Sequence, residues 1–284
     1  ACLIGIFQHI KGIGIDYGDG LVRIRGTALD PNDYAMHLII LIPITIGLFF
    51  NYRNIIAMIF LLLSFILLVI NTIFTYSRVG MISLALILIV SLFKVIFQRH
   101  KKVSPLILIV ISLVILIPFI PSQYWKRAKT ISDFNDFAIQ ARLDVWETGI
   151  EMIKDHPFIG IGPGLFRYEY LLRAYMSSEE KTRIPLFSHN AYIQIGAETG
   201  VFGLLFFLLL LFFSWQDLKK AENNFKERND LLYAGLALNL RLALLGYSIC
   251  AFFLTQAFLT MLWIILPLAV ILKKFSLELE DGTK

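Results

Sequence analysis

Long runs of apolar residues constrain the fold of this chain more than any other feature of its sequence. Residues 55–74 carry no charge, and a helix of about 20 residues is long enough to cross the hydrocarbon core of a bilayer. Similar runs recur along the 284 residues, 57% of which are hydrophobic, whereas soluble domains contain about 45–50% apolar residues. The sequence therefore predicts an all-α fold, a polytopic bundle of transmembrane helices.

The apolar runs predict about seven spans in this fragment. We expect them at residues 34–50, 55–74, 79–97, 105–121 and 189–214, with two more sharing residues 231–272 around a turn near 254–256. Asp30 and Pro31 are typical of a helix start, as N-cap and first helical residue. Residues 1–10 resemble the end of a further span, so we interpret the sequence as the C-terminal part of a longer protein.

Three short basic segments predict the orientation of the spans. Residues 98–102, 215–230 and 273–274 are rich in lysine and arginine, and such loops stay on the cytoplasmic side of helical membrane proteins. With seven spans, all three segments lie on one side. We therefore expect a multi-pass membrane protein whose long polar loop at residues 122–187 faces the outer side.

This orientation also predicts how the chain is organised. Membrane spans occupy residues 1–121, with a short outer loop at 11–33, and spans again occupy residues 188–272. Between them, residues 122–187 form one large, partly helical periplasmic loop, and residues 273–284 form a cytoplasmic tail. Neither ATP nor a sugar nucleotide is available outside the inner membrane, so a transferase acting there needs a donor that is already activated.

Charge and composition argue against several other classes of protein. The net charge is +5, but the basic residues are spread over loops between spans, so we expect no nucleic-acid partner. Cys2 and Cys250 both lie in apolar surroundings and give no disulfide framework. The five histidines show no metal-binding spacing. We expect no metal site and no cofactor.

His189 is the first candidate for chemistry. Ser188 is a plausible N-cap, which would place His189 and Asn190 in the first turn of a span. The positive end of the helix dipole disfavours an imidazolium, and a neutral imidazole can accept a proton from a sugar hydroxyl. Taken alone, the residue favours a simpler interpretation, a hydrogen-bonded histidine at the membrane interface.

Arginines supply the second element of the predicted site. Arg142 and Trp146 are i,i+4 neighbours on an amphipathic helix predicted at residues 141–153, where a guanidinium could bind phosphate oxygens. Arg78 lies at the outer turn between two spans and could be a second cation for a diphosphate. Arg25 would share a face with Arg23 in an extended stretch. The alternatives are solvated or snorkelling arginines.

Two further features favour structural roles. Residues 155–164 contain one proline that stops a helix, a second near their end and three glycines that allow a tight path back to the membrane. They lack the ending of a nucleotide-binding loop, so a role in shaping the chain is favoured over phosphate binding. Arg241 lies deep in a predicted span, far from the outer site, and a structural ion pair is the simpler expectation.

Taken together, these pieces resemble the O-antigen ligase and O-antigen polymerase (Wzy-type) family. The resemblance rests, in chain order, on Arg25-Gly26 with Pro31-Asn32, on Ser77-Arg78-Val79-Gly80, on Arg142-x-x-x-Trp146 with His156-Pro157 and Gly160-Ile161-Gly162-Pro163-Gly164, and on His189-Asn190-Ala191-Tyr192 with Glu198-Thr199-Gly200-Val201-Phe202-Gly203.

The resemblance implies a metal-independent, inverting glycosyltransferase. Its donor would be a glycan on undecaprenyl diphosphate, and its acceptor the lipid A–core, another glycan or a protein. It would be a multi-pass protein of the bacterial inner membrane whose active site faces the periplasm. The family's two essential arginines map to Arg78 and Arg142, which would hold the diphosphate. Its histidine maps to His189, which would activate or orient the acceptor hydroxyl. The substrate-binding residues would be Arg25, Trp146, Asn190 and Tyr192.

Two other classes of function remain open on the sequence. A flippase or polysaccharide transporter would place polar residues near the bilayer midplane, where Arg241 and Asn71 are the only hints. A scaffold for an envelope complex would explain a large outer loop. It would not explain the placement of the arginines and the histidine.

Overall fold

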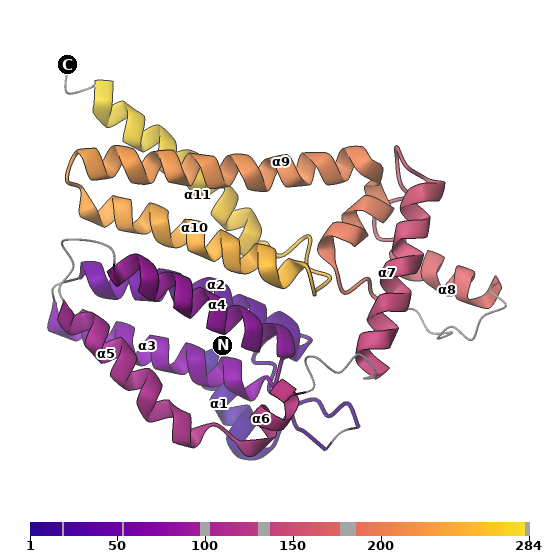
Figure 1. The fold of residues 1–284 in the computed structure, drawn as a ribbon, viewed down its shortest axis with the longest axis horizontal. Helices are drawn as coiled ribbons and strands as arrows, with labels where there is room; N and C mark the ends of the chain where they lie inside the picture. Colours follow the sequence, from indigo (N-terminus) through magenta and orange to yellow (C-terminus); the bar gives the residue numbers. More distant parts are fainter. Residues whose placement is uncertain (19, 53, 97–102, 130–136, 177–185, 282–284) are drawn as a thin grey trace. The chain divides into compact units, whose positions relative to one another are not determined.

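The computed structural model describes residues 1–18, 20–52, 54–96, 103–129, 137–176 and 186–281. Over these residues the chain is built from helices, with one isolated antiparallel bridge between Ile15 and Arg23 and no strand (Figure 1). The prediction of an all-α fold is confirmed. The basic segment at residues 98–102 lies outside the described residues.

The helices follow one another along the chain with short connections. They are α1 (Cys2–Lys11), α2 (Pro31–Asn51), α3 (Ile55–Phe74), α4 (Arg78–Ile96), α5 (Val103–Leu116), the 3-10 turn η1 (Ile117–Phe119), α6 (Ser122–Lys129), α7 (Phe137–Asp155), α8 (Phe166–Met176), α9 (Ala191–Glu227), α10 (Leu231–Ala251) and α11 (Thr260–Asp281). Helices α6, α7 and α8 lie in the segment predicted to be a partly helical loop. The periplasmic location of that segment remains a prediction.

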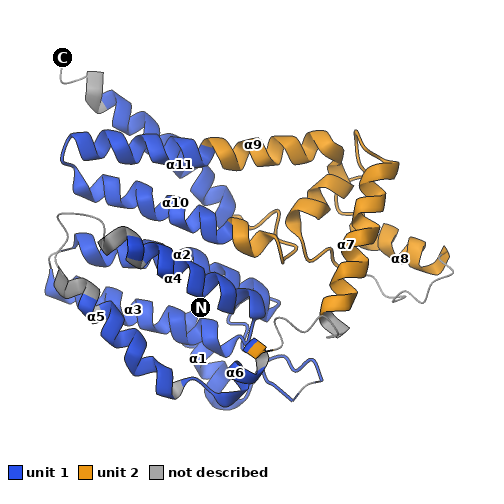
Figure 2. Cartoon of the chain, viewed as in Figure 1, with its two compact units in different colours: residues 1–128, 214–247, 261–284 blue, residues 129–213, 248–260 orange. Residues whose placement is uncertain are grey.

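The chain divides into two compact units (Figure 2). Unit 1 comprises residues 1–128, 214–247 and 261–284, and unit 2 comprises residues 129–213 and 248–260. In unit 1, α2 packs against α3 and α4, and α3 also contacts α1, α4 and α5. Unit 2 contains α7, α8, the N-terminal part of α9 and the connection between α10 and α11.

Five helices in the described part of the chain are long and apolar enough to cross a membrane, namely α2, α3, α9, α10 and α11. They correspond to five of the predicted spans. Helix α5 has 14 residues, and the described apolar part of α4 ends at Ser91. A total of about seven spans would require α4 and α5 to cross the membrane as well, and this stays a prediction.

The predicted start of the first span is confirmed. The Asp30 carboxylate accepts a hydrogen bond from the backbone N–H of Asn32 at 2.7 Å, and Pro31 is the first helical residue. An N-cap carboxylate occupies one of the N–H groups that the first turn of a helix leaves open.

The predicted basic loop at residues 215–230 is wrong for most of its length, because α9 continues as a helix to Glu227. Leu218, Ala221 and Phe225 repeat at helical spacing and are fully buried. The Phe225 ring stacks on Tyr233 of α10, with the ring centroids 5.3 Å apart. Apolar packing on one face of the helix thus outweighs the charges on the other.

Arg241 forms the structural ion pair that was predicted from its position deep in a membrane span. Its Nη2 atom lies 2.8 Å from the Glu222 carboxylate, and both side chains are buried. Asn71, the other hint of a transporter, accepts a hydrogen bond from the Tyr34 hydroxyl at 3.0 Å and donates one to the Leu67 carbonyl at 2.8 Å. Both polar groups are therefore engaged within unit 1.

The Arg241–Glu222 pair yields a test of stability. We expect Glu222→Gln to lower the free energy of unfolding by about 3–5 kcal/mol, because it leaves a buried guanidinium without its counter-charge. Thermal unfolding in detergent would measure the change. Glu278→Gln is the control, since it removes a carboxylate from an exposed i,i+4 ion pair with Lys274. Equal melting temperatures for the two variants would contradict the assignment.

Candidate functional site

The central feature of unit 2 is a break in helix α9 at Gly200, which has φ 71° and ψ −175°. In an unbroken helix, each carbonyl accepts from the N–H four residues later. Here the carbonyls of Ala197 and Glu198 accept from the N–H groups of Ile161 and Gly162, at 2.9 and 3.0 Å. These backbone groups therefore find their partners in the glycine-rich loop at residues 157–164.

The loop also satisfies the donor side of the break. The N–H of Val201, which would point to Ala197 in a continuous helix, donates to the Pro157 carbonyl at 2.7 Å. Since the N–H groups of Ile161 and Gly162 are committed to α9, they do not cradle a phosphate. The interpretation that this loop shapes the chain agrees with the structure.

Two glycines make the close approach of loop and helix possible. Gly160 has φ 72°, and a Cβ there would lie 2.4 Å from the carbonyl carbon of Glu198. A Cβ on Gly200 would lie 2.3 Å from the carbonyl oxygen of Phe158. Both positions thus require glycine for backbone conformation and for space.

The side chains around the break also form hydrogen bonds. The buried carboxylate of Glu198 accepts from the N–H of Phe166, the first residue of α8, at 3.4 Å and from the Gln194 amide at 3.3 Å. The Thr199 hydroxyl donates to the Ile195 carbonyl at 2.6 Å. The Glu-Thr-Gly segment therefore has a structural role at each of its positions.

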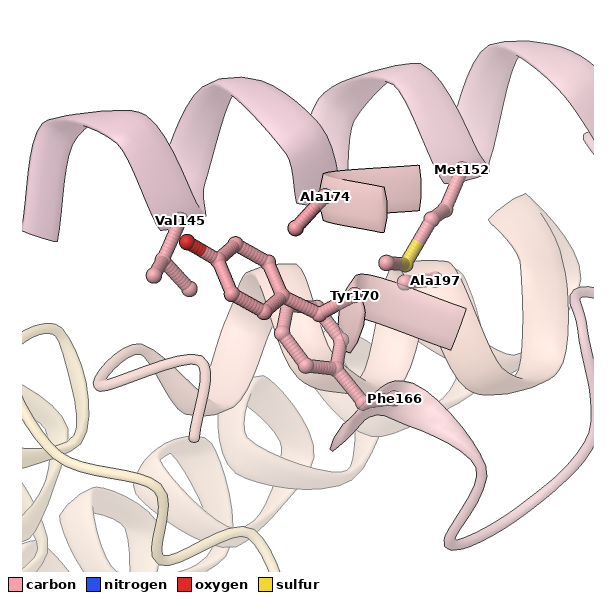
Figure 3. Close-up of a cluster of buried hydrophobic side chains, with 6 residues drawn as sticks. All are labelled: Val145, Met152, Phe166, Tyr170, Ala174 and Ala197. Carbon is pink, nitrogen blue, oxygen red and sulfur yellow. The ribbon is translucent and has the colours of Figure 1, made fainter. Parts of the chain in front are cut away.

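A small hydrophobic core joins α7, α8 and α9 (Figure 3). Its members are Val145, Met152, Phe166, Tyr170, Ala174 and Ala197. Burial, and then the nearby Asp144 carboxylate, raise the pKa of the Tyr170 hydroxyl, which stays protonated at neutral pH. Arg173 adds ion pairs to Asp155 of α7 at 2.7 Å and to Glu169 of α8 at 2.8 Å. This packing fixes α7, which carries Arg142 and Trp146, against the start of α9.

The start of α9 differs from the prediction. The N-cap is Asn190 and not Ser188, because the Asn190 side-chain oxygen accepts from the N–H groups of Tyr192 and Ile193 at 2.9 and 3.0 Å. His189 consequently stands before the helix and not in its first turn. Its side chain is half-buried, and its backbone has φ 47°, a conformation uncommon outside glycine.

Hydroxyl groups hold His189 in this conformation. Its N–H donates to the Thr255 hydroxyl oxygen at 2.7 Å. The Thr255 and Ser188 hydroxyls are 3.2 Å apart, and the Ser188 hydroxyl donates to the Asn190 carbonyl at 3.0 Å. Because the single proton of Ser188 is used in that bond, Thr255 is the donor to Ser188. One chain of hydrogen bonds thus runs from the His189 backbone through Thr255 and Ser188 to Asn190.

The connection between α10 and α11 also brings two predicted residues together. Phe252 lies edge-on to Trp146 of α7, with the ring centroids 5.6 Å apart, and 6.5 Å from the ring of Tyr192. The Tyr192 hydroxyl donates to the Ser248 carbonyl at 3.0 Å. Trp146, Tyr192 and the His189 backbone therefore all contact residues 248–255, and Arg142, half-buried, lies one turn before Trp146 on α7.

The remaining predicted residues, Arg78 and Arg25, belong to unit 1. Arg78 is the first residue of α4 and is half-buried. Arg25 is exposed, and its guanidinium donates to the Leu29 carbonyl at 3.3 Å. Arg23, in contrast, is 4% exposed, and a face shared by the two arginines stays a prediction.

Hydrogen bonds tie together the motif segments around Arg78. The Ser77 hydroxyl donates to the Asn32 side-chain oxygen at 2.7 Å and accepts from the N–H of Gly80 at 3.1 Å. The N–H of Ile24 donates to the Phe74 carbonyl at 3.3 Å. The Pro31-Asn32 and Ser77–Gly80 segments therefore meet where α2 and α4 begin, and the residues just before Arg25 and Ser77 are hydrogen-bonded to each other.

Sequence reasoning missed Thr255 and Phe252. Thr255 lies in a segment that the sequence marked only as a turn, Phe252 lies just before that turn, and Thr255 is 66 residues from its partner His189. A local pattern carries no signal for such a pairing. Among the residues that the structure describes, no group of three or more His, Cys, Asp or Glu is placed to hold a metal ion.

Fold and composition define the class of this protein: a multi-pass membrane protein built from helices, with a polar, partly helical segment between its spans. Comparison with known families makes the class specific. A family model described as O-antigen ligase matches residues 63–208, just over half of the chain, and the chain belongs to this family. The resemblance based on the sequence motifs is confirmed. A search of curated proteins found no match.

The glycine contacts of unit 2 can be tested by substitution. We expect Gly160→Ala to lower the free energy of unfolding by clearly more than the about 1–2 kcal/mol that a left-handed backbone costs a non-glycine residue, because the new Cβ collides with backbone of α9. Gly164→Ala is the matched control: it has φ 78° and no atom within 4 Å of the new Cβ. Thermal unfolding and limited proteolysis would measure both. Equal losses would show that the collision is absent.

Proposed function

We propose that this O-antigen ligase family member transfers a glycan from undecaprenyl diphosphate to an acceptor hydroxyl at the periplasmic face of the inner membrane. The observation that carries the proposal is the backbone conformation and partial burial of His189. A half-buried imidazole stands at the end of a membrane helix, on a backbone conformation that a relay of hydroxyl groups maintains. Unusual backbone conformations that the surroundings enforce are typical of functional sites.

The proposed reaction is one displacement. The acceptor hydroxyl oxygen attacks the anomeric carbon of the donor sugar, a new glycosidic bond forms, and the bond between that carbon and the diphosphate oxygen breaks. His189 accepts the hydroxyl proton, and undecaprenyl diphosphate leaves. A single attack from the face opposite the leaving group inverts the configuration of the anomeric carbon.

The two arginines neutralise the leaving group in this proposal. Arg78 and Arg142 would each present a planar guanidinium to phosphate oxygens, a geometry that suits bidentate binding. This charge neutralisation takes the part that a divalent metal ion plays in other phosphate chemistry, so the reaction is proposed to proceed without one. Arg78 lies in unit 1, and Arg142 and His189 lie in unit 2.

Aromatic and amide groups would complete the substrate site. Trp146 and Tyr192, which meet at Phe252, present ring surfaces of the kind that pack against sugars and sit at the membrane interface. Asn190 caps α9 through its side-chain oxygen, so we propose that it acts on the substrate through the position of His189. Arg25, exposed on the outer loop of unit 1, would contact a distal part of the glycan.

Transport without covalent chemistry gains no support from the structure. The two intramembrane polar residues that pointed to it, Arg241 and Asn71, are paired within unit 1. The residues left for function are those at the helix ends. The acceptor remains to be assigned, and restoring a ligase-null strain and, separately, a polymerase-null strain with the gene would identify it from the banding of surface polysaccharide.

The mechanism predicts that three side chains are essential. We expect Arg78→Ala, Arg142→Ala and His189→Ala each to lower glycan transfer by at least about 100-fold, as loss of a general base or a charge clamp does, while the protein still inserts. Arg142→Lys should also be poor, because a point charge replaces a planar fork. Transfer is measured with a purified lipid-linked donor in proteoliposomes.

Lys154→Ala is the matched control for Arg142, because it removes an exposed positive charge from the same helix. It should leave transfer unchanged. Substantial transfer by a double variant, Arg142→Ala with His189→Ala, would rule the mechanism out.

Thr255 offers a second, independent test of the role of His189. We expect Thr255→Val to lower turnover about fivefold, since it removes the hydroxyl that accepts from the His189 N–H, and a hydrogen bond contributes about 1 kcal/mol. Thr255→Ser keeps the hydroxyl and should retain most of the activity. The KM for the lipid-linked donor should not change in either variant, because Thr255 positions His189 and does not bind the donor. Equal activity in Thr255→Val and the unaltered protein would overturn this role.

A further inference from the structure

The part of α9 that follows the break at Gly200 has an apolar stretch shorter than the hydrocarbon core of a bilayer, although α9 as a whole is long enough to cross it. Residues 201–215 extend for about 22 Å at about 1.5 Å per residue, whereas the hydrocarbon core is about 30 Å thick. After Trp215 the sequence becomes polar, with Gln216 and Asp217. About 8 Å of hydrocarbon must therefore lie beside the break itself, and any tilt of the helix makes this shortfall larger.

The exposed surface of α9 shows where lipid contact begins. Large apolar side chains at least 38% exposed line the helix immediately after the break: Val201, Phe202, Leu205, Phe206, Leu208, Leu210, Phe212 and Phe213. An outward-facing apolar stripe of this kind on a membrane helix contacts acyl chains. The stripe starts next to Gly200, with no polar residue between.

The glycine-rich loop places two more apolar side chains at this level. The ring of Phe158 stacks on that of Phe202, with centroids 6.0 Å apart and an interplanar angle of 27°. Phe158 is 66% exposed and its neighbour Ile159 is 84% exposed. We call these two residues the apolar tip. It continues the lipid-facing stripe of α9 towards the N-terminal end of the helix.

The backbone around the apolar tip meets the condition that a membrane imposes. Non-helical backbone is tolerated at membrane depth only where protein satisfies its polar groups. Here the carbonyls of Ala197 and Glu198 and the N–H of Val201 all bond to the loop. A loop in water would not need such pairing, since water would solvate the open groups.

Charged residues limit how deep the tip can reach. Lys154 and Asp155, at the end of α7, are exposed and precede the tip by only a few residues. Charges are costly in the hydrocarbon core, so these side chains belong at headgroup level. The apolar tip therefore reaches the outermost part of the acyl-chain region and no further.

We propose that residues 157–160 form a re-entrant turn whose apolar tip, Phe158 and Ile159, is inserted among lipid acyl chains in the leaflet next to the N-terminal end of α9. The partner is lipid and not a second protein, because the tip is continuous with the lipid-facing stripe of a membrane helix. The insertion fills the thickness that α9 leaves uncovered. It holds the break, and with it the start of α9, at a fixed depth.

Spin labelling of the reconstituted protein tests the proposal. Cys2 and Cys250, the two cysteines of the chain, are replaced by alanine, and single cysteines are introduced by Ile159→Cys, Phe206→Cys and Glu147→Cys. Phe206 is 68% exposed on the lipid-facing stripe, and Glu147 is an exposed acid on α7. The nitroxide at each site is measured in proteoliposomes for its accessibility to oxygen, which concentrates in acyl chains, and to a water-soluble nickel chelate.

The expected result at position 159 is an oxygen-to-chelate ratio close to that at position 206 and several-fold above that at position 147. A chelate accessibility equal to that at position 147 would place the tip in water and overturn the proposal. Low accessibility to both reagents would mean that protein covers the tip, which overturns it as well. Since Ile159 is largely exposed, its replacement removes little packing. The outcome does not depend on glycan transfer.

Discussion

A break in an apolar helix leaves backbone N–H and C=O groups without partners. The hydrogen bonds that satisfy these groups determine much of the structure of unit 2. At Gly200, the glycine-rich loop supplies two donors and one acceptor to the interrupted helix. Each unsatisfied group of this kind costs several kcal/mol in an apolar surrounding. The loop can supply them only by lying directly against the helix, which explains why glycine is needed at both contact points.

The position of the candidate site follows from this contact. The break holds the loop at the end of α7, and the core formed with α8 fixes the rest of α7 against α9. Trp146 and Tyr192 are thereby brought to Phe252, and residues near Phe252 hold the backbone of His189. A few long-range hydrogen bonds and ring contacts thus connect four segments that are distant in the sequence.

Sequence reasoning predicted the features that have a local cause. Uninterrupted apolar runs predicted α3 to the residue and α2 to within three residues, and Asp30 with Pro31 predicted the start of α2 because a cap acts within one turn. The ordered motif segments predicted the family. The depth of Arg241 predicted an ion pair, since a charge among apolar residues requires one.

Features that depend on tertiary packing could not be predicted in this way. Ser188 and Asn190 are both good caps, and the choice between them follows from the left-handed backbone at His189, which Thr255 stabilises from another part of the chain. The length of α9 was underestimated because its charged second half looks like a loop until Leu218 and Phe225 find partners. The glycine-rich loop was assigned a shaping role, but its partner at residues 197–201 could not be identified.

Glu198 gives this arrangement a practical consequence. A carboxylate from α9 caps the first turn of α8, so the helix in the polar segment takes part of its N-terminal stabilisation from a membrane helix. The polar segment and the span therefore fold as one cooperative piece. Excising residues 129–187 as a water-soluble fragment would remove the cap, the Ala197 side chain from the core and the carbonyls that order the loop, so the excised piece would lose its native conformation.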